Sequence, residues 1–148
     1  MANHDAVKTA FARWGSEHGY RKKSTRWYLD GDDVLVVVDL QKSQYGRAYY
    51  VNVAFWLREL GDDPSPPENR CHVRTRLEKI ANVEDELPAL NLEIDIPVER
   101  RERMLESLLA HLDDRVTVLR SVRSLKNAME AGWNPVTVPA ARQLFAQT

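Results

Sequence analysis

Cysteine is almost absent from this sequence, since Cys71 is the only one among its 148 residues. A single thiol forms no disulfide within the chain, and without a second cysteine most zinc-site patterns are excluded. The four histidines also lack the HxH and HExxH spacings of metal sites. The N-terminus has no basic stretch followed by an apolar run. We therefore expect a cytoplasmic protein without a bound metal.

Long apolar runs, an excess of charge and glycine-rich loops are missing too. The longest apolar run, residues 34–38, is far shorter than the ~20 residues of a membrane-spanning helix. The 21 Lys and Arg nearly balance the 22 Asp and Glu, so no broad positive field attracts nucleic acid. The six glycines are scattered, so neither of the phosphate-binding motifs GxxxxGK[ST] and GxGxxG is present. The GxSxG motif of serine hydrolases is absent too. We expect no membrane or nucleic-acid partner and no cofactor.

What remains is an ordinary globular composition, with 43% hydrophobic and 29% charged residues. A chain of this length buries roughly 68–70% of its unfolded surface, enough for a hydrophobic core without disulfides. We expect one domain over residues 1–148, as a monomer or a small homo-oligomer. The first element is a helix, because one apolar face follows helical spacing through Val7, Ala10, Phe11 and Trp14. Asn3 or Asp5 is the expected cap, and Gly19 suits the left-handed position after the helix.

Alternation of period two then predicts an antiparallel meander. Its strands are expected at 24–29, 34–41, 47–57 and 71–77, with a short fifth one at 90–96. The run 34–41 is apolar on both faces, as in a central strand. Three prolines within residues 61–70 predict a surface loop. In the fourth strand, we expect Cys71, Val73, Thr75 and Leu77 on one face and His72, Arg74 and Arg76 on the other.

The rest of the chain is helical by its spacing. One helix, opened by Asp95 and Pro97, carries the apolar face Met104, Leu105, Leu108, Leu109 and Leu112. A second is predicted through Val118, Val122, Leu125 and Met129, although residues 115–119 are also compatible with an extended segment. Pro135 and Pro139 frame an expected terminal turn that places Leu144 and Phe145 on the core. The predicted class is α+β: an N-terminal helix, an antiparallel meander of four to five strands, and C-terminal helices packed on one face of the sheet.

Short motifs distributed over most of the chain carry a family resemblance. They are Gly19-Tyr20-Arg21-Lys22-Lys23, Trp27-Tyr28, Leu40-Gln41-Lys42-Ser43, residues 49–53 and residues 71–77. In these the chain resembles a mostly bacterial family, the domain-of-unknown-function family 4304 (DUF4304). The family's usual tryptophan-rich stretch after the fourth strand is replaced here by Leu90-Asn91-Leu92. The resemblance implies a small α+β fold and no established activity.

In three of the predicted strands, the polar residues occupy alternate positions that point to the same face of the sheet. They are Asp39, Gln41, Tyr50, Asn52, His72, Arg74 and Arg76. On neighbouring strands they form one polar face, and two guanidiniums beside an imidazole suit a carboxylate or a phosphate. The same pattern is also typical of a solvated sheet face with ordinary cross-strand pairs. Cys71 and His72 point apart if both lie on the strand, and could meet only if Cys71 remains in the loop, which favours a buried structural cysteine over an activated thiolate.

Two hypotheses from different classes follow. The first is a noncatalytic module whose polar sheet face, bordered by the proline-rich loop, binds another protein. An immunity or accessory protein beside a bacterial toxin is one version of it, by analogy of size alone. The second is a small enzyme or anionic-ligand binder, with His72 as general acid or base and Arg74 and Arg76 holding the anion. The second requires the three side chains to converge in a pocket.

Overall fold

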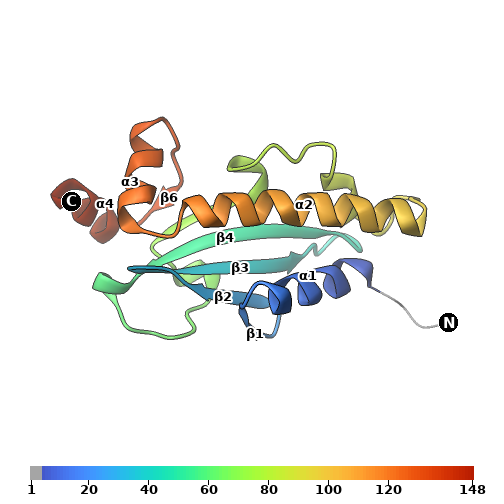
Figure 1. Ribbon diagram of the computed structural model, residues 1–148, viewed down its shortest axis with the longest axis horizontal. Coiled ribbons are helices and arrows are strands. Elements are labelled where there is room, and N and C mark those ends of the chain that lie inside the picture. The colour runs from blue at the N-terminus through green and yellow to red at the C-terminus, as the bar shows by residue number, and fades with distance from the viewer. Residues whose placement is uncertain (1–4) are drawn as a thin grey trace.

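One antiparallel sheet organises the chain in this computed structural model, which describes residues 5–148 (Figure 1). Its strands are β1 (Arg21–Lys23), β2 (Arg26–Asp30), β3 (Val34–Lys42), β4 (Tyr49–Leu57), β5 (Val73–Arg76) and β6 (Val136–Thr137). They lie in chain order from β1 to β6, which confirms the predicted meander. Six strands form instead of four to five, because β1 and β6 are too short for their alternation to show in the sequence. Residues 24 and 25 turn between β1 and β2 instead of opening a strand.

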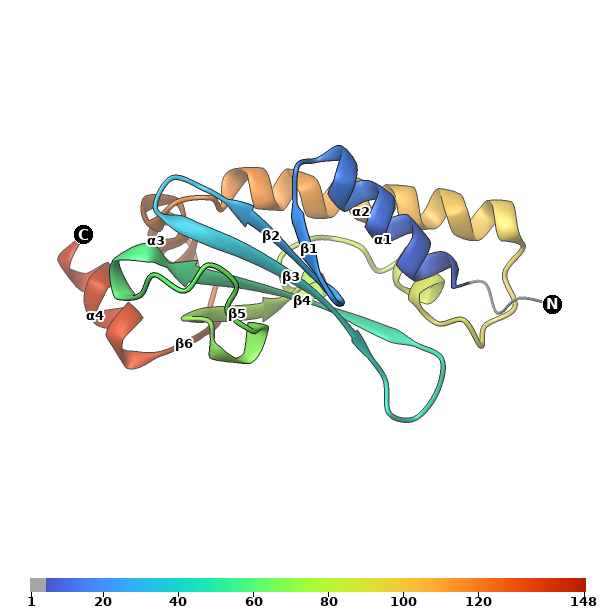
Figure 2. The same cartoon turned by 90° about the horizontal axis from the view of Figure 1, so that it is seen from below.

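The helices pack on one face of this sheet. They are α1 (Ala6–Glu17), α2 (Val98–Val118), α3 (Val122–Glu130) and α4 (Pro139–Gln147). The long helix α2 follows the length of the sheet, and α1 lies beside it (Figures 1 and 2). Between them and the sheet lies the main core, which includes Phe11, Val36, Val38, Val53, Phe55, Leu105, Leu108 and Leu112. The α+β class and the helix-covered face are therefore as the sequence predicts.

Helix α1 is bounded by two local signals. The Asp5 carboxylate accepts a hydrogen bond from the Lys8 backbone N–H at 3.0 Å, as an N-cap does, and a second one from the Tyr49 hydroxyl. The cap therefore also connects α1 to β4. Asn3, the other expected cap, lies outside the described residues. At the other end Gly19 has φ +80°, the left-handed conformation that glycine adopts without strain.

The C-terminal segment is more helical than the sequence indicates. Helix α2 runs without interruption to Val118, so the extended alternative for residues 115–119 is wrong. The Ser121 hydroxyl then caps α3 by accepting from the Ser124 N–H at 3.1 Å. Pro139–Gln147 form the nine-residue helix α4 instead of a turn, with the proline in the first turn, where its missing N–H costs nothing. Leu144 and Phe145 are buried, as expected.

The expected fifth strand at 90–96 is wrong. Leu87–Leu90 form a 3₁₀ helix, and Asn91 makes a single bridge to Ala48. The reason lies in α2, where Arg101 is buried and donates to three backbone carbonyls of this segment. The guanidinium reaches the carbonyl oxygens of Ala89 at 2.7 Å, Asn91 at 3.1 Å and Ile94 at 2.6 Å. Backbone carbonyl groups that would bond a neighbouring strand in a sheet are therefore bonded to the Arg101 side chain instead.

Cys71 faces the opposite way from the prediction. It packs with Tyr28, Leu35, Val37 and Ala54 on the face turned away from α1 and α2, whereas Val73 and Leu77 join the main core. Strand alternation does not reach Cys71, because β5 begins only at Val73. Its N–H instead closes the 3₁₀ turn Glu68–Arg70 by donating to the Glu68 carbonyl at 3.1 Å.

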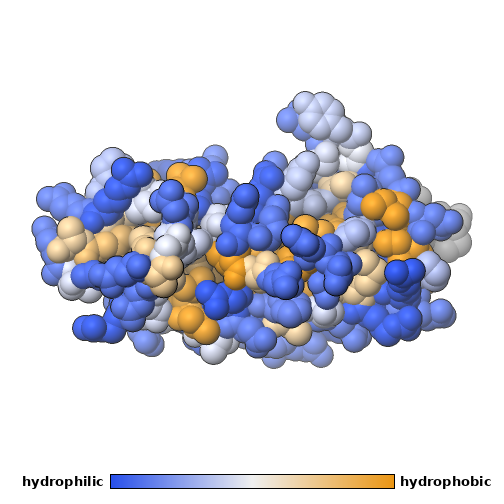
Figure 3. Space-filling view, turned by 90° about the horizontal axis from the view of Figure 1, so that it is seen from above, coloured by the Kyte–Doolittle hydropathy of each residue, from blue (hydrophilic) through white to orange (hydrophobic). Residues whose placement is uncertain are grey.

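Among residues 5–148, none of the helices is long and apolar enough to cross a bilayer. Seen from above, hydrophobic residues surface as separate patches among hydrophilic side chains (Figure 3). The hairpin between β3 and β4 extends away from the body of the fold and carries Tyr45, which is 91% exposed (Figure 2).

Candidate binding site on the second sheet face

The sheet face turned away from α1 and α2, here called the second face, is divided into an apolar and a polar part. Strand register fixes the division, because cross-strand partners form rows. The apolar rows are Leu35 with Trp56, and Tyr28 with Val37 and Ala54. The polar rows are Arg26 with Asp39, Asn52 and Arg76, and Gln41 with Tyr50. The sequence predicts one polar face, and the structure shows that only part of it is polar.

The proline-rich loop, residues 61–70, covers the apolar rows. The Tyr28 hydroxyl donates to the Pro66 carbonyl at 3.0 Å, and the Trp56 indole N–H donates to the Gly61 carbonyl at 2.9 Å. A Cβ added to Gly61 would lie 2.5 Å from the Trp56 ring, so only glycine allows this approach. The loop is therefore a cover for this part of the face as well as the border that we expected.

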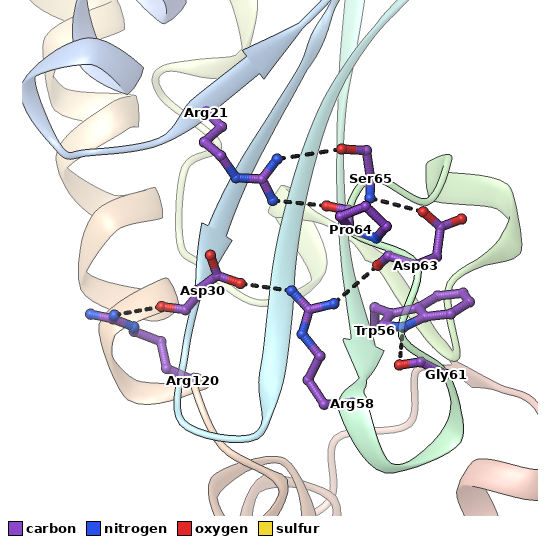
Figure 4. A network of polar contacts seen from close by, with 9 residues as sticks. All are labelled: Arg21, Asp30, Trp56, Arg58, Gly61, Asp63, Pro64, Ser65 and Arg120. Carbon is purple, nitrogen blue, oxygen red and sulfur yellow. Dashed lines mark hydrogen bonds and ion pairs between the residues drawn. The ribbon is translucent and has the colours of Figure 1, made fainter.

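Two arginines hold the proline-rich loop from the sheet side (Figure 4). The Arg58 guanidinium bonds the Asp30 carboxylate at 2.7 Å and the Asp63 carbonyl at 3.0 Å. Arg21, from β1, bonds the Pro64 carbonyl at 2.8 Å and the Ser65 hydroxyl at 3.3 Å. The two arginines thus fix the loop at the consecutive residues Asp63, Pro64 and Ser65.

Asn52 is the centre of the polar rows and is only 6% exposed. Its amide nitrogen donates to Asp39 at 3.1 Å and to Gln41 at 2.9 Å, and its amide oxygen accepts from Arg76 Nε at 3.3 Å. The Arg76 guanidinium carbon also lies 4.3 Å from the centre of the Tyr50 ring, a cation–π contact. Five of the seven predicted site residues therefore form one connected cluster.

Burial and hydrogen bonding act in opposite directions on Asp39 in this cluster. Burial raises the pKa of the carboxyl above its usual value, and the hydrogen bond from Asn52 opposes that rise. The pKa of Asp39 is therefore raised overall.

Arg74 is engaged by the protein itself. Its Nε and Nη2 atoms bond the two carboxylate oxygens of Glu68 at 2.8 and 3.3 Å, a bidentate ion pair. The hydrogen bonds to Glu68 are the main reason why the pKa of Arg74 is raised. Glu68 belongs to the proline-rich loop, so the loop neutralises one of the two arginines that we expected to hold an anion.

His72 is separated from the cluster. It precedes β5, stacks on Trp56 with ring centres 4.2 Å apart, and accepts a hydrogen bond from the Leu57 N–H through Nδ1 at 2.8 Å. Burial lowers the pKa of this imidazole. The thiol of Cys71 contacts the Pro67 carbonyl instead, and burial raises its pKa to about 12. The two groups thus have different partners, and the cysteine is buried, as predicted.

A hollow of about 620 Å³ adjoins the polar rows. Its lining comes from β3, β4, the proline-rich loop, β5, the segment after β5, and β6 with the turn before it. It includes Gln41, Asn52, Glu68, Arg74, Arg76, Lys79, Trp133 and Val136. His72 is not part of this lining, so the convergence of His72, Arg74 and Arg76 that the enzyme hypothesis requires is not what the geometry gives. Within residues 5–148 no carboxylate lies within 4 Å of Arg76 or Lys79.

Sequence reasoning did not identify Lys79, Trp133 and Val136 as parts of this site. Lys79 follows the strand in a 3₁₀ turn, where the parity of β5 no longer applies. Residues 133–136 reach the hollow only because β6, two residues long, pairs with Val73 and Arg74. A pairing that short leaves no alternation in the sequence from which it could be found. For the described part of the chain, no group of His, Cys, Asp and Glu is placed to hold a metal ion.

The arrangement defines a class of protein, an α+β domain built on a meander sheet. Helices cover one face of the sheet, and a loop covers part of the other face. The chain belongs to the family described as "Domain of unknown function (DUF4304)", which it matches over residues 16–137. The match includes all six strands, α2 and α3, and excludes α4 and most of α1. No curated protein and no solved structure matches the chain. The resemblance found in the sequence is therefore confirmed, and the family's description names no activity.

Proposed function

We propose that the chain is a noncatalytic protein-binding module that holds an acidic segment of another protein over the polar rows and the adjoining hollow. The observation that carries the proposal is Arg76, whose guanidinium is positioned by Tyr50 and Asn52 but paired with no carboxylate among the described residues. A guanidinium that is already oriented loses little side-chain entropy when it binds a carboxylate.

The charges around the hollow favour an acidic occupant. Glu68 is neutralised by Arg74, and Asp39 is hydrogen-bonded within the cluster by Asn52. Asn52 carries no charge, so Asp39 stays negative, but Asp39 is not part of the lining of the hollow. Of the four charged residues that do line it, Arg76 and Lys79 are the two without an ion pair among the described residues, and both are positive. Charge-assisted hydrogen bonds from these groups to carboxylates are about twice as strong as neutral ones.

The apolar part of the lining favours a protein segment over a small anion. Trp133 and Val136 lie beside the two cations, and Val136 is 66% exposed although it is a large aliphatic residue. Aromatic and arginine side chains in one patch are typical of protein interfaces. An immunity or accessory protein that masks an acidic region of a toxin would be one module of this kind.

Zero-length cross-linking tests the proposal at one atom. A carbodiimide joins the Lys79 amine only to a carboxylate in direct contact with it. Treated in lysate of its own cells, the wild-type chain should give a cross-link from Lys79 to an Asp or Glu of a second protein. Lys79→Arg should keep the partner bound while losing that cross-link, because the charge remains and the reactive amine does not.

Charge reversal then separates this site from charge in general. Arg76→Glu with Lys79→Glu should abolish capture of the cross-linked protein, whereas Arg100→Glu with Arg103→Glu makes the same change of net charge on exposed positions of α2 and should not. Equal loss in both double variants would show that only net charge matters. Cross-links from Lys79 solely to a second copy of this chain would contradict the proposal and show that the site forms a homo-oligomer contact.

A further inference from the structure

A groove lies between α1 and α2, on the helix-covered side of the sheet and away from the hollow described above. It encloses about 600 Å³ and is unrelated to the polar rows. Its lining on α1 begins at Ala6 and ends at His18, and its lining on α2 begins at Val98 and ends at Asp114. The two helices start at the same end of this groove and run in the same direction (Figures 1 and 2).

The length of the groove fits a helix. The lining spans thirteen residues on the α1 side and seventeen on α2, which correspond to roughly 18 to 24 Å at 1.5 Å rise per residue. A compact small molecule fills a rounder pocket, whereas a groove of this length between two helices accepts a third helix of about 12 to 16 residues.

The floor of the groove is apolar. Ala6 and Ala10 on α1 leave room between the helices, and Leu105 and Leu109 on α2 form the base with Trp14. Small residues facing large ones give the kind of surface into which the apolar side chains of an amphipathic helix insert.

The walls are acidic. Glu102, Glu106, Asp113 and Asp114 from α2 and Glu17 from α1 line the groove, against Arg13 and His18 as its basic groups. His18 lies 3.8 Å from Asp113, so one carboxylate has a partner when that imidazole is protonated. Glu102 and Glu106 form no ion pair with any described residue. Four residues apart, they present two carboxylates on one line of α2.

We propose that the α1–α2 groove binds a basic amphipathic helix of a partner protein. The apolar face of that helix lies on Ala10, Leu105 and Leu109, and Lys or Arg residues four apart on its flank meet Glu102 and Glu106. The polar rows take no part in this interaction, so the proposal is independent of the function proposed above.

The test uses a defined probe, a 14-residue peptide of Leu and Lys at helical spacing, and a second peptide with Glu in place of every Lys. Both are titrated into the full chain, and methyl resonances are followed by NMR. The Lys peptide should bind saturably, with shifts concentrated at Ala10, Leu105 and Leu109, and its affinity should fall as salt rises. The Glu peptide should not bind.

Charge exchange gives the decisive comparison. Glu102→Lys with Glu106→Lys should weaken the Lys peptide at least about tenfold and create binding of the Glu peptide, because like charges then replace opposite ones. Glu84→Lys with Asp85→Lys changes the net charge equally on an exposed loop and should leave both titrations unchanged. Ala110→Tyr, at an exposed lining position, should block the groove without entering the core.

Three results would overturn the proposal. Spermine binding as tightly as the Lys peptide would show that the groove reads positive charge alone. A dimer of the free chain in sedimentation experiments, lost in the Glu102 and Glu106 double variant, would make a second copy the occupant. Shifts spread over the whole molecule, or equal weakening in the loop variant, would mean that the peptide binds without this groove.

Discussion

The imidazole Nδ1 of His72 accepts a hydrogen bond from the Leu57 backbone N–H at 2.8 Å. The ring is therefore neutral in the folded chain, with its proton on Nε2, because a protonated Nδ1 has no lone pair to offer. This bond joins the residue before β5 to the last residue of β4 and continues their pairing beyond Val73. A residue predicted to act on a ligand is thus used to align two strands.

This contact makes stability depend on pH. Burial lowers the pKa of folded His72 below the ordinary value of 6.5, so the unfolded chain takes up a proton at a pH where the folded chain does not. The contribution of His72 is complete above pH 6.5 and is lost as the pH falls below it. We expect the free energy of unfolding, measured with urea between pH 7.5 and 5, to decrease over that range.

His72→Asn isolates the effect, because its side-chain oxygen accepts from the Leu57 N–H without titrating. The variant should show a smaller decrease toward pH 5 than the wild type. His111→Gln, on α2, controls for the loss of an imidazole elsewhere. Identical pH profiles for the wild type and His72→Asn would contradict the assignment.

A second prediction concerns Gly15, in the last turn of α1. Alanine in place of glycine normally stabilises a helix by about 1 kcal/mol. Here an added Cβ would lie 2.3 Å from Cδ1 of the buried Trp27 ring, and neither group has room to move in the core. Gly15→Ala should therefore lower the free energy of unfolding by about 1–3 kcal/mol, measured by urea denaturation.

Ser16→Ala is the matched control, since Ser16 is exposed in the same turn. It should change stability by less than about 0.5 kcal/mol. If Gly15→Ala were as stable as Ser16→Ala, the close approach of α1 to β2 would be wrong.

Gly15 also shows where the sequence was informative and where it was not. Regular alternation identifies β3 and β4, and helical spacing identifies α1 and α2, because many positions repeat the same signal. Gly15 weakens the helix pattern when read locally, and only the position of Trp27 explains its presence. The same holds for residues 90–96, whose alternation is that of a strand until Arg101 bonds their carbonyl groups.

For the site, parity within strands was enough to group Asp39, Gln41, Tyr50, Asn52 and Arg76. Parity also assigned His72 to this face, where it stacks on Trp56, but gave no sign that it lies outside the cluster. It also gave no sign that Glu68 pairs with Arg74, because contacts between a loop and a strand follow no period.

A third prediction follows from the burial of Arg101, which is 7% exposed. Arg101→Leu leaves the carbonyls of Ala89, Asn91 and Ile94 without their donor. The free energy of unfolding should fall by about 2–4 kcal/mol, since each unsatisfied buried group costs about 1–3 kcal/mol and water replaces part of the loss. Hydrogen exchange should also accelerate in residues 87–94.

Arg101→Lys should recover only part of that stability, because an ammonium lacks the planar fork that reaches three acceptors. Arg103→Leu, at an exposed position of the same helix, serves as the control and should stay within about 0.5 kcal/mol of the wild type. A comparable loss in both leucine variants would refute the role of Arg101.

The last prediction uses Cys71 as a reporter of the proline-rich loop. The thiol is 1% exposed, and burial raises its pKa to about 12, so it is neither accessible nor ionised in the closed protein. Labelling by a disulfide reagent at pH 8 should be slow and should proceed through opening of the loop. Arg58→Ala removes the contacts to Asp30 and to the Asp63 carbonyl, and should speed labelling about three- to tenfold.

The control must separate loop opening from unfolding of the whole chain. Arg123→Ala removes an exposed arginine from α3 and should leave the labelling rate unchanged. The free energy of unfolding should change less in Arg58→Ala than the labelling rate implies, since the main core between the sheet and the helices contains neither Arg58 nor Asp30. If acceleration of labelling matched the loss of global stability, Cys71 would be reached only by complete unfolding, and the loop would not open separately from the sheet it covers.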